Sequence, residues 1–172
     1  GTGAVATTVQ AKLRESVSVK DFGAVGDSNI NGGGGTDDTA SILLAAAYCV
    51  TSGASLFFPS GHVFRITSQI DLSSVIEIDA KGGIYADSIT GTPAVVIGAL
   101  SSTTKGLYYK FSEIHDGGSR SAAPTDPLLR VFGLKNAQVD VQACRYIQIY
   151  ADTASTTTNS VAYNQFTLGY TF

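Results

Sequence analysis

The chain has 172 residues, enough for one domain with a substantial core, and only 15 % of them are charged, against a usual share of about a quarter. Its 11 basic and 14 acidic residues are scattered, which excludes the concentrated positive surface that binds nucleic acid or an anionic membrane. No apolar run approaches the roughly 18 residues of a membrane-spanning helix, so we expect neither nucleic acid nor a membrane as a partner.

Composition divides the chain into three parts. Residues 1–16 are small and polar, with a short amphipathic stretch at Val9–Leu13, and we interpret them as an N-terminal stem or linker. Residues 17–55 are predicted to hold a strand over Val17–Phe22, a glycine-rich loop and a helix. Because the run Gly32–Gly35 has no side chain to pack, we expect its trimming to be nearly neutral for stability. Residues 56–172 complete the single structural domain, and since the sequence begins at Gly1 we expect it to be an N-terminal fragment of a longer protein.

A helix is predicted over residues 37–51. Thr36 suits the N-cap position, and Asp37 and Asp38 place negative charge at the positive end of the helix dipole. Gly53 stands where helices commonly stop. The stripe expected to face the core, at helical spacing, consists of Ile42, Ala45, Ala46 and Cys49.

No metal site and no cofactor are expected. Asp27, Asp37 and Asp38 form an acidic group, but the start of a helix accounts for two of them and their spacing is not that of a calcium-binding loop. Two cysteines are too few for a zinc site, so Cys49 and Cys144 are interpreted as buried thiols.

Everything after the helix is predicted to be strand and turn, which makes the fold class all-β. An antiparallel sandwich would favour tight Asn-Gly turns, and none follows the helix. Residues 128–152 instead suggest three successive strands with short corners, as in one rung of a parallel β-helix, a solenoid. In that fold the early strand and the helix would cap the first rung. The predicted strands are residues 55–59, 63–67, 75–80, 94–98, 107–114, 128–133, 139–143, 146–151 and 163–172.

Three segments in combination carry a family resemblance. VSVKDFGAVGD (17–27), TDDTASILLAA (36–46) and LFFPSGHVFRI (56–66) resemble the N-terminal signature of the pectate-lyase-like β-helix superfamily, in the version found in bacteriophage tailspikes and tail fibres. The resemblance covers residues 1–66, with a longer and more glycine-rich loop than the family pattern. It implies a right-handed parallel β-helix and a homotrimer on the virion, joined through its N-terminal side to other tail or baseplate proteins. It also implies binding of host surface polysaccharide, often with cleavage.

Several acidic residues are weak catalytic candidates, since none matches a family motif. Glu77 and Asp79 share a strand face at about 6.5–7 Å, within the range of glycoside hydrolases, although the sequence places no aromatic side chain beside them. Glu113 and Asp116 flank His115 near Arg120 and could serve acid–base chemistry. Solvated strands and polar loops are the commoner explanation of both groups. The remaining candidate is Asp140.

A possible sugar-binding face is predicted near the C-terminal end. If Ile147 and Ile149 point inward, then Tyr146, Gln148 and Tyr150 share one exposed face, which Tyr108 or Tyr109 could extend. Aromatic rings beside amides suit sugars, but the same tyrosines could pack against a neighbouring subunit.

The sequence therefore favours a phage virion protein for attachment to host surface polysaccharide. The first alternative is a polysaccharide lyase or glycoside hydrolase in its own right, and the second is a purely structural virion connector. We expect the 172-residue chain to lack depolymerase activity, and a longer parent protein to be the candidate enzyme.

Overall fold

The computed structural model describes residues 8, 15–98, 108–117, 127–132, 137–144, 147–150 and 165–170. This part of the chain is mostly β, with one α-helix, α2 (Thr39–Ser52), and one short 3-10 helix, η1 (Val19–Phe22). None of its helices is long and apolar enough to cross a membrane. The strands are β1 (Ser16–Ser18), β2 (Ser55–Phe58), β3 (Val63–Ile66), β4 (Ile70–Asp71), β5 (Glu77–Ala86), β6 (Val95–Ile97), β7 (Tyr108–His115), β8 (Leu129–Phe132), β9 (Gln138–Cys144), β10 (Ile147–Tyr150) and β11 (Gln165–Tyr170).

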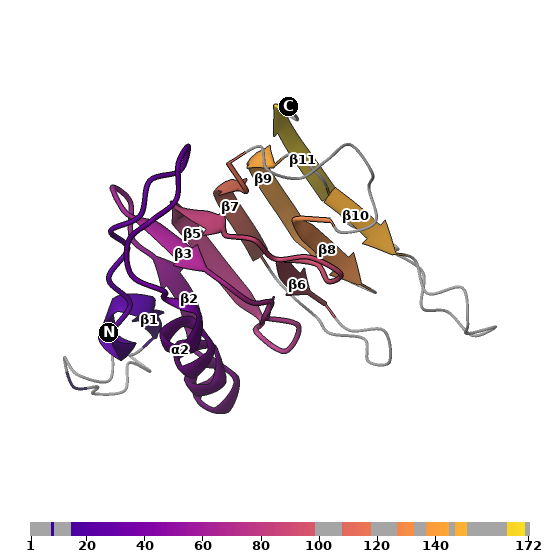
Figure 1. The fold of residues 1–172 in the computed structure, drawn as a ribbon. Coiled ribbons are helices and arrows are strands. Elements are labelled where there is room, and N and C mark those ends of the chain that lie inside the picture. The colour runs from indigo at the N-terminus through magenta and orange to yellow at the C-terminus, as the bar shows by residue number, and fades with distance from the viewer. Residues whose placement is uncertain are drawn as a thin grey trace.

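The strands form two sheets in which every described pairing is parallel. The larger sheet has the order β1-β2-β5-β7-β9-β11, with β3 beside β5, and the smaller one the order β4-β6-β8-β10 (Figure 1). From β4 onward the chain alternates between the sheets, and each new strand lies beside the strand of the same sheet that preceded it. The prediction of a mostly-β chain is confirmed, and the parallel pairing excludes antiparallel hairpins in the described residues.

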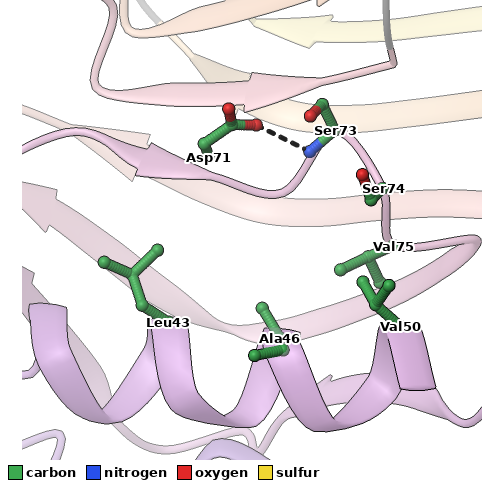
Figure 2. Close-up of a pocket in the computed structure, with 8 residues that line it drawn as sticks. Leu43, Ala46, Val50, Asp71, Ser73, Ser74 and Val75 are labelled. Carbon is green, nitrogen blue, oxygen red and sulfur yellow. Dashed lines mark hydrogen bonds between the residues drawn. The ribbon is translucent and has the colours of Figure 1, made fainter. Parts of the chain in front are cut away.

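Helix α2 lies at the end of the structure where β1 and β2 begin the larger sheet, and it packs against β1, β2 and β4 (Figure 1). The predicted inward stripe is buried, including Ile42 and Cys49. The helix ends as predicted at Gly53, whose positive φ of 72° lets its N–H bond to the Cys49 carbonyl at 2.8 Å. The other flank of α2 and the turn after β4 enclose a groove of about 230 Å³ (Figure 2). Its lining is Leu43, Ala46, Ala47, Val50, Asp71, Ser73, Ser74 and Val75.

The predicted start of the helix is wrong by two residues. Asp38, and not Thr36, occupies the N-cap position, and its side chain makes no capping hydrogen bond. Thr36 is unavailable because its backbone N–H and its hydroxyl both donate to Asp27, at 2.7 and 3.2 Å.

The first predicted strand is shorter than expected. Only Ser16–Ser18 pair with β2, and the chain then turns into η1. Ser18 and Asp21 form a capping box, in which the Ser18 hydroxyl accepts from the Lys20 N–H and Asp21 accepts from the Ser18 N–H. Val17 and Val19 are nevertheless both buried, as their alternation predicts.

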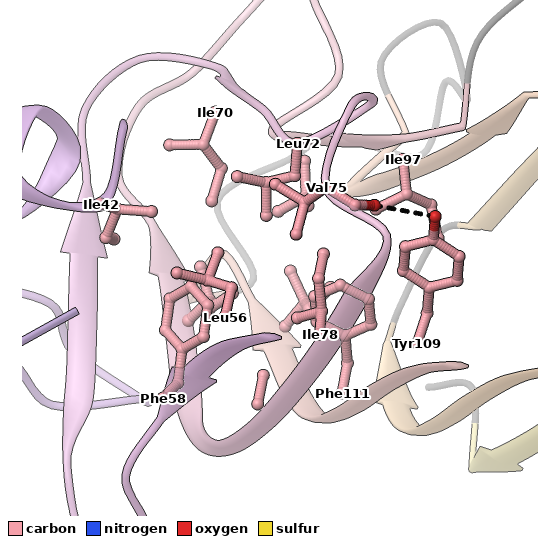
Figure 3. Close-up of a cluster of buried hydrophobic side chains, with 14 of the residues drawn as sticks. Ile42, Leu56, Phe58, Ile70, Leu72, Val75, Ile78, Ile97, Tyr109 and Phe111 are labelled. Atoms are coloured by element: carbon pink, nitrogen blue, oxygen red, sulfur yellow. Dashed lines mark hydrogen bonds between the residues drawn. The ribbon is translucent and has the colours of Figure 1, made fainter. Parts of the chain in front are cut away.

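The core lies between the two sheets, where side chains at paired positions of neighbouring strands lie in rows. In the larger sheet Leu56, Ile78, Tyr109 and Val139 form one such row, and Phe58, Ala80, Phe111 and Val141 form the next. Ile70, Val95, Leu129 and Ile147 form a facing row in the smaller sheet. Figure 3 shows Ile70 of the smaller sheet pointing toward Leu56 and Phe58 of the larger sheet, with Ile42 of α2 beside them. Each large apolar side chain removed from water stabilises the fold by about 1.5–3 kcal/mol.

A candidate ligand-binding face

The outward side chains of the larger sheet form a polar and aromatic surface. One row, in register across β5, β7 and β9, consists of Glu77, Tyr108 and Gln138. A second row, in register across β2, β5, β7 and β9, consists of Phe57, Asp79, Lys110 and Asp140. These side chains alternate along each strand with the buried core residues, so all of them leave the sheet on the same side. We call the set the outer face: Phe57, Glu77, Asp79, Lys81, Tyr108, Lys110, Gln138 and Asp140.

The predicted absence of aromatic neighbours for Glu77 and Asp79 is wrong. Tyr108 stands next to Glu77 on the adjacent strand, and Phe57 stands next to Asp79 on the other side. Lys81 links the second pair, because its ammonium lies 5.4 Å from the Phe57 ring centre and 3.4 Å from Asp79 Oδ2. The sequence could not reveal these neighbours, since they are brought together by strand pairing between distant segments.

Most polar side chains of the outer face have no protein partner. Five of these side chains form no hydrogen bond or ion pair within the described residues, although all five are only partly exposed. They are Glu77, Tyr108, Lys110, Gln138 and Asp140. One further atom, Asp79 Oδ1, is buried without a hydrogen-bond partner. Donors and acceptors in this state can exchange water for the hydroxyl groups of a ligand without first breaking contacts inside the protein.

The outward side of the same sheet has a second part, next to the outer face, over β3 and the second half of β5. This part is covered by a loop of the protein itself. The loop of residues 23–38 lies along it, with isolated parallel bridges from Asp27 to Val63 and from Asp37 to Arg65. Arg65 binds Asp87 at 2.8 Å and also donates to the Gly35 carbonyl at 3.2 Å. Because these polar groups already bind one another, this face offers a ligand much less than the outer face does.

Two glycines of the run Gly32–Gly35 are packed closely against other residues, whereas the effect of trimming the run stays a prediction. A Cβ at Gly33, where φ is +67°, would lie 2.6 Å from Tyr85 Cε1. A Cβ at Gly35, where φ is +82°, would lie 2.7 Å from Asp27 Oδ1. Gly32, in contrast, has open space around it.

The three aspartates of the acidic group hold this loop in place. Asp27 accepts from Thr36, and Asp37 accepts from the Thr39 N–H and from the hydroxyls of Thr39 and Thr67, the last at 2.6 Å. Asp38 is buried and accepts from the backbone N–H groups of Val25 and Gly26, at 2.6 and 3.1 Å. They therefore anchor the loop, and neither Asp37 nor Asp38 lies in the first turn of α2.

These hydrogen bonds also lower carboxyl pKa values. The Thr36 N–H lowers the pKa of Asp27, and the Arg65 side chain lowers the pKa of Asp87. Burial alone would raise the pKa of Asp37, but the hydrogen bonds from Thr39 and Thr67 outweigh it and leave that pKa below its usual value.

Of the candidates near the end of β7, Glu113 forms no hydrogen bond or ion pair within the described residues. Glu113 lies in the second half of the strand, in register with Gly83 and Ala143. Asp116 is only 1 % exposed, and His115 Nδ1 accepts from the Gly117 N–H at 2.9 Å. Arg120 lies outside the described residues.

The predicted tyrosine face is only partly described, and one member is wrong. Tyr109 is fully buried, its hydroxyl donates to the Val75 carbonyl at 2.9 Å, and burial raises its pKa to about 12. Gln148 accepts from Arg130 Nε at 3.2 Å, and Tyr150 pairs through its backbone with Phe132. Tyr146 and the Tyr150 side chain lie outside the description.

The inward orientation of the two isoleucines agrees with the register. Ile147 packs against the core, and Ile149 is paired with the buried Val131, although it is itself 41 % exposed.

Both cysteines are buried free thiols, as predicted, and burial raises the pKa of Cys49 to about 11. In the described residues no three His, Cys, Asp or Glu side chains come together as metal ligands.

Replacing Gly33 should destabilise the protein because of the loop packing. Gly33→Ala is expected to cost about 1–3 kcal/mol, since it combines a positive φ with a contact against Tyr85. The matched control Gly32→Ala should change the free energy of unfolding by less than about 0.5 kcal/mol. Urea unfolding of both variants measures the difference, and equal stabilities would contradict the packing of the loop on Tyr85.

Stability should fall in acid because three loop-associated carboxyls have lowered pKa values. A carboxyl whose folded pKa lies below its unfolded value, 3.8 for Asp, stabilises the fold above that value and loses the contribution as the pH falls through the folded pKa. The free energy of unfolding, measured with urea, should therefore be constant from pH 7 to about 5 and should decrease below about pH 4. Thr67→Val, which removes one hydrogen bond to Asp37, should reduce this acid-induced loss, and an unchanged pH profile would speak against the anchoring role.

Comparison of the chain with models of known protein families, with curated proteins and with solved structures finds no match. Any assignment of function therefore rests on the residues and contacts of this chain.

Proposed function

We propose that this chain is the N-terminal part of a phage tailspike or tail fibre that attaches the virion to host surface polysaccharide. In this proposal it folds as a right-handed parallel β-helix whose first rung is capped by α2. The fold is supported by the parallel pairing and by the regular alternation of the chain between two sheets. The position of α2 against β1 and β4 supports its role as a cap, because these are the end strands of the two sheets and their edges would otherwise be open.

The observation that carries the binding function is the outer face. It combines Tyr108 and Phe57 with polar side chains that the protein itself leaves without partners. A sugar ring offers an apolar face that packs on an aromatic ring and hydroxyls that bond to the polar groups around it. A surface built from stacked strands is also long and shallow, which suits a polymer better than a small molecule.

The outer face is assigned to binding and not to cleavage. Asp79 and Asp140 are in register two strands apart, so their backbones are separated by roughly 9.6 Å, at the upper limit for a pair of hydrolytic carboxyls. Lys110 lies between them in the same row, where an attacking water would have to stand. Asp79 is also held by Lys81.

Assembly as a homotrimer is supported by the surface of α2. The helix carries no charged residue, and besides its buried stripe it exposes Leu43, Leu44 and Val50, to 37 %, 59 % and 49 %. A helix that is apolar on most of its circumference is normally covered by another element. We propose that copies of the chain cover one another here, with the groove of Figure 2 receiving an apolar side chain of the next copy. Other tail or baseplate proteins would attach on the same N-terminal side.

Binding is tested on an array of bacterial capsular and O-antigen polysaccharides. Tyr108→Ala should weaken binding of the recognised polymer about ten-fold or more, because it removes the stacking ring. Phe132→Ala, which truncates an aromatic residue of β8 in the smaller sheet, is the matched control and should bind as the wild type does.

Three outcomes separate the proposal from its alternatives. Binding without new reducing ends or unsaturated uronate is the expected result. Turnover that is lost in Glu77→Gln or Asp140→Asn would favour the enzyme, and a trimer that binds no polymer would favour the structural connector.

Self-assembly is tested by light scattering on the full chain. The wild type should have about three times the monomer mass of 17.8 kDa. Leu44→Glu should produce a folded monomer, because this side chain is exposed, whereas Ile42→Asp should unfold the protein by burying an unpaired carboxylate at a cost of several kcal/mol. Gln142→Glu, at an exposed position in β9, controls for the added charge. A wild-type monomer at micromolar concentration would contradict the assembly.

A further inference from the structure

The charges of the outer face alternate along one row. Asp79, Lys110 and Asp140 occupy equivalent positions on β5, β7 and β9, so neighbouring backbones in the row are about 4.8 Å apart. Glu77 adds a third carboxylate two residues from Asp79, on the side where Tyr108 stands. The centre of the face is therefore a cation with a carboxylate on each side.

Lys110 is the one cation of this face that is free to meet a ligand. Lys81 is engaged by Asp79 and by the Phe57 ring, whereas Lys110 binds neither of its flanking aspartates. An anionic group placed on Lys110 would lie nearly as close to Asp79 and Asp140 as to the ammonium. It would meet two repulsions for one attraction.

A cationic ligand meets one repulsion, because an ammonium attracted to Asp79 or Asp140 would lie next to Lys110, which stands between them. The same face carries the carboxylates of Glu77, Asp79 and Asp140, so its charges repel a cation less than they repel an anion. A ligand without charge avoids every one of these repulsions, while its hydroxyls can donate to the carboxylates and accept from Lys110 and from the Gln138 amide. Tyr108, in register with Glu77 and Gln138, supplies a ring against which such a sugar can stack.

We propose that the outer face selects an uncharged, hydroxyl-rich polysaccharide and rejects polymers of uronate, sialate or sugar phosphate. This inference rests on the proposed attachment function and names the class of its ligand. The carboxylates of Asp79 and Asp140, on either side of Lys110, exclude the anionic polymers.

The test sorts the polysaccharides of the array into neutral, anionic and cationic sets. The wild-type chain should bind neutral members and no anionic member, and binding of the neutral polymer should change less than two-fold between low and physiological salt, because no net ion pair is formed. Asp140→Asn should gain binding to anionic polymers, since one of the two flanking repulsions is removed, and should keep its binding to neutral ones within about ten-fold. Glu113→Gln removes the same charge from the second half of β7 and should leave the preference unchanged.

The outcomes distinguish this inference from the function on which it rests. Binding of an anionic polymer that is lost in Tyr108→Ala would overturn the selection by charge and leave attachment at this face intact. Failure to bind any member of the three sets would overturn attachment itself. An Asp140→Asn variant that still rejects anionic polymers would show that its carboxylate does not exclude them.

Discussion

The structure depends above all on the parallel register between strands that are distant in the sequence. Backbone hydrogen bonding places Ile78 beside Tyr109 and Tyr109 beside Val139, and a shift of one residue would move each of these side chains from the core to the surface. The register therefore determines the core and the outer face together. It also accounts for the buried Tyr109 hydroxyl, which lies within 2.9 Å of the Val75 carbonyl and so avoids the cost of an unpaired polar group.

The outward side of the larger sheet has two parts with different roles, because the loop of residues 23–38 covers one of them. Residues 23–38 lie over β3 and the second half of β5, where Gly33 contacts the Tyr85 ring and Arg65 binds both the loop and Asp87. The polar groups there are satisfied within the protein, and they stabilise the first part of the fold. The outer face, formed by the first halves of β5, β7 and β9, keeps its polar groups for water or a ligand. In the function proposed above, its alternating charges would restrict which ligand can approach, and affinity and selectivity would arise from neighbouring side chains of the same face.

Helix α2 combines two surfaces with different partners. Ile42 and Cys49 face the core and belong to the fold of a single chain. Leu44 and Val50 face outward without a charged residue on the helix, which makes this end of the molecule the place where assembly would begin. The proposed assembly surface on α2 and the proposed binding surface on the outer face would then be physically separate, so a mutation in one need not disturb the other.

The sequence by itself determined the features that depend on neighbours a few residues away. Alternation along the chain predicted a mostly-β fold, helical spacing predicted the burial of Ile42 and Cys49, and Gly53 marked the end of the helix. The tertiary structure decided which segments meet. Strand pairing turns Tyr108, and not Tyr109, outward beside Glu77. Thr36 donates to Asp27 and therefore does not cap the helix. Gly33 packs closely against Tyr85, which the sequence could not show. Such contacts follow from the register of strands about thirty residues apart and from close packing between them, and local periodicity carries no information about either.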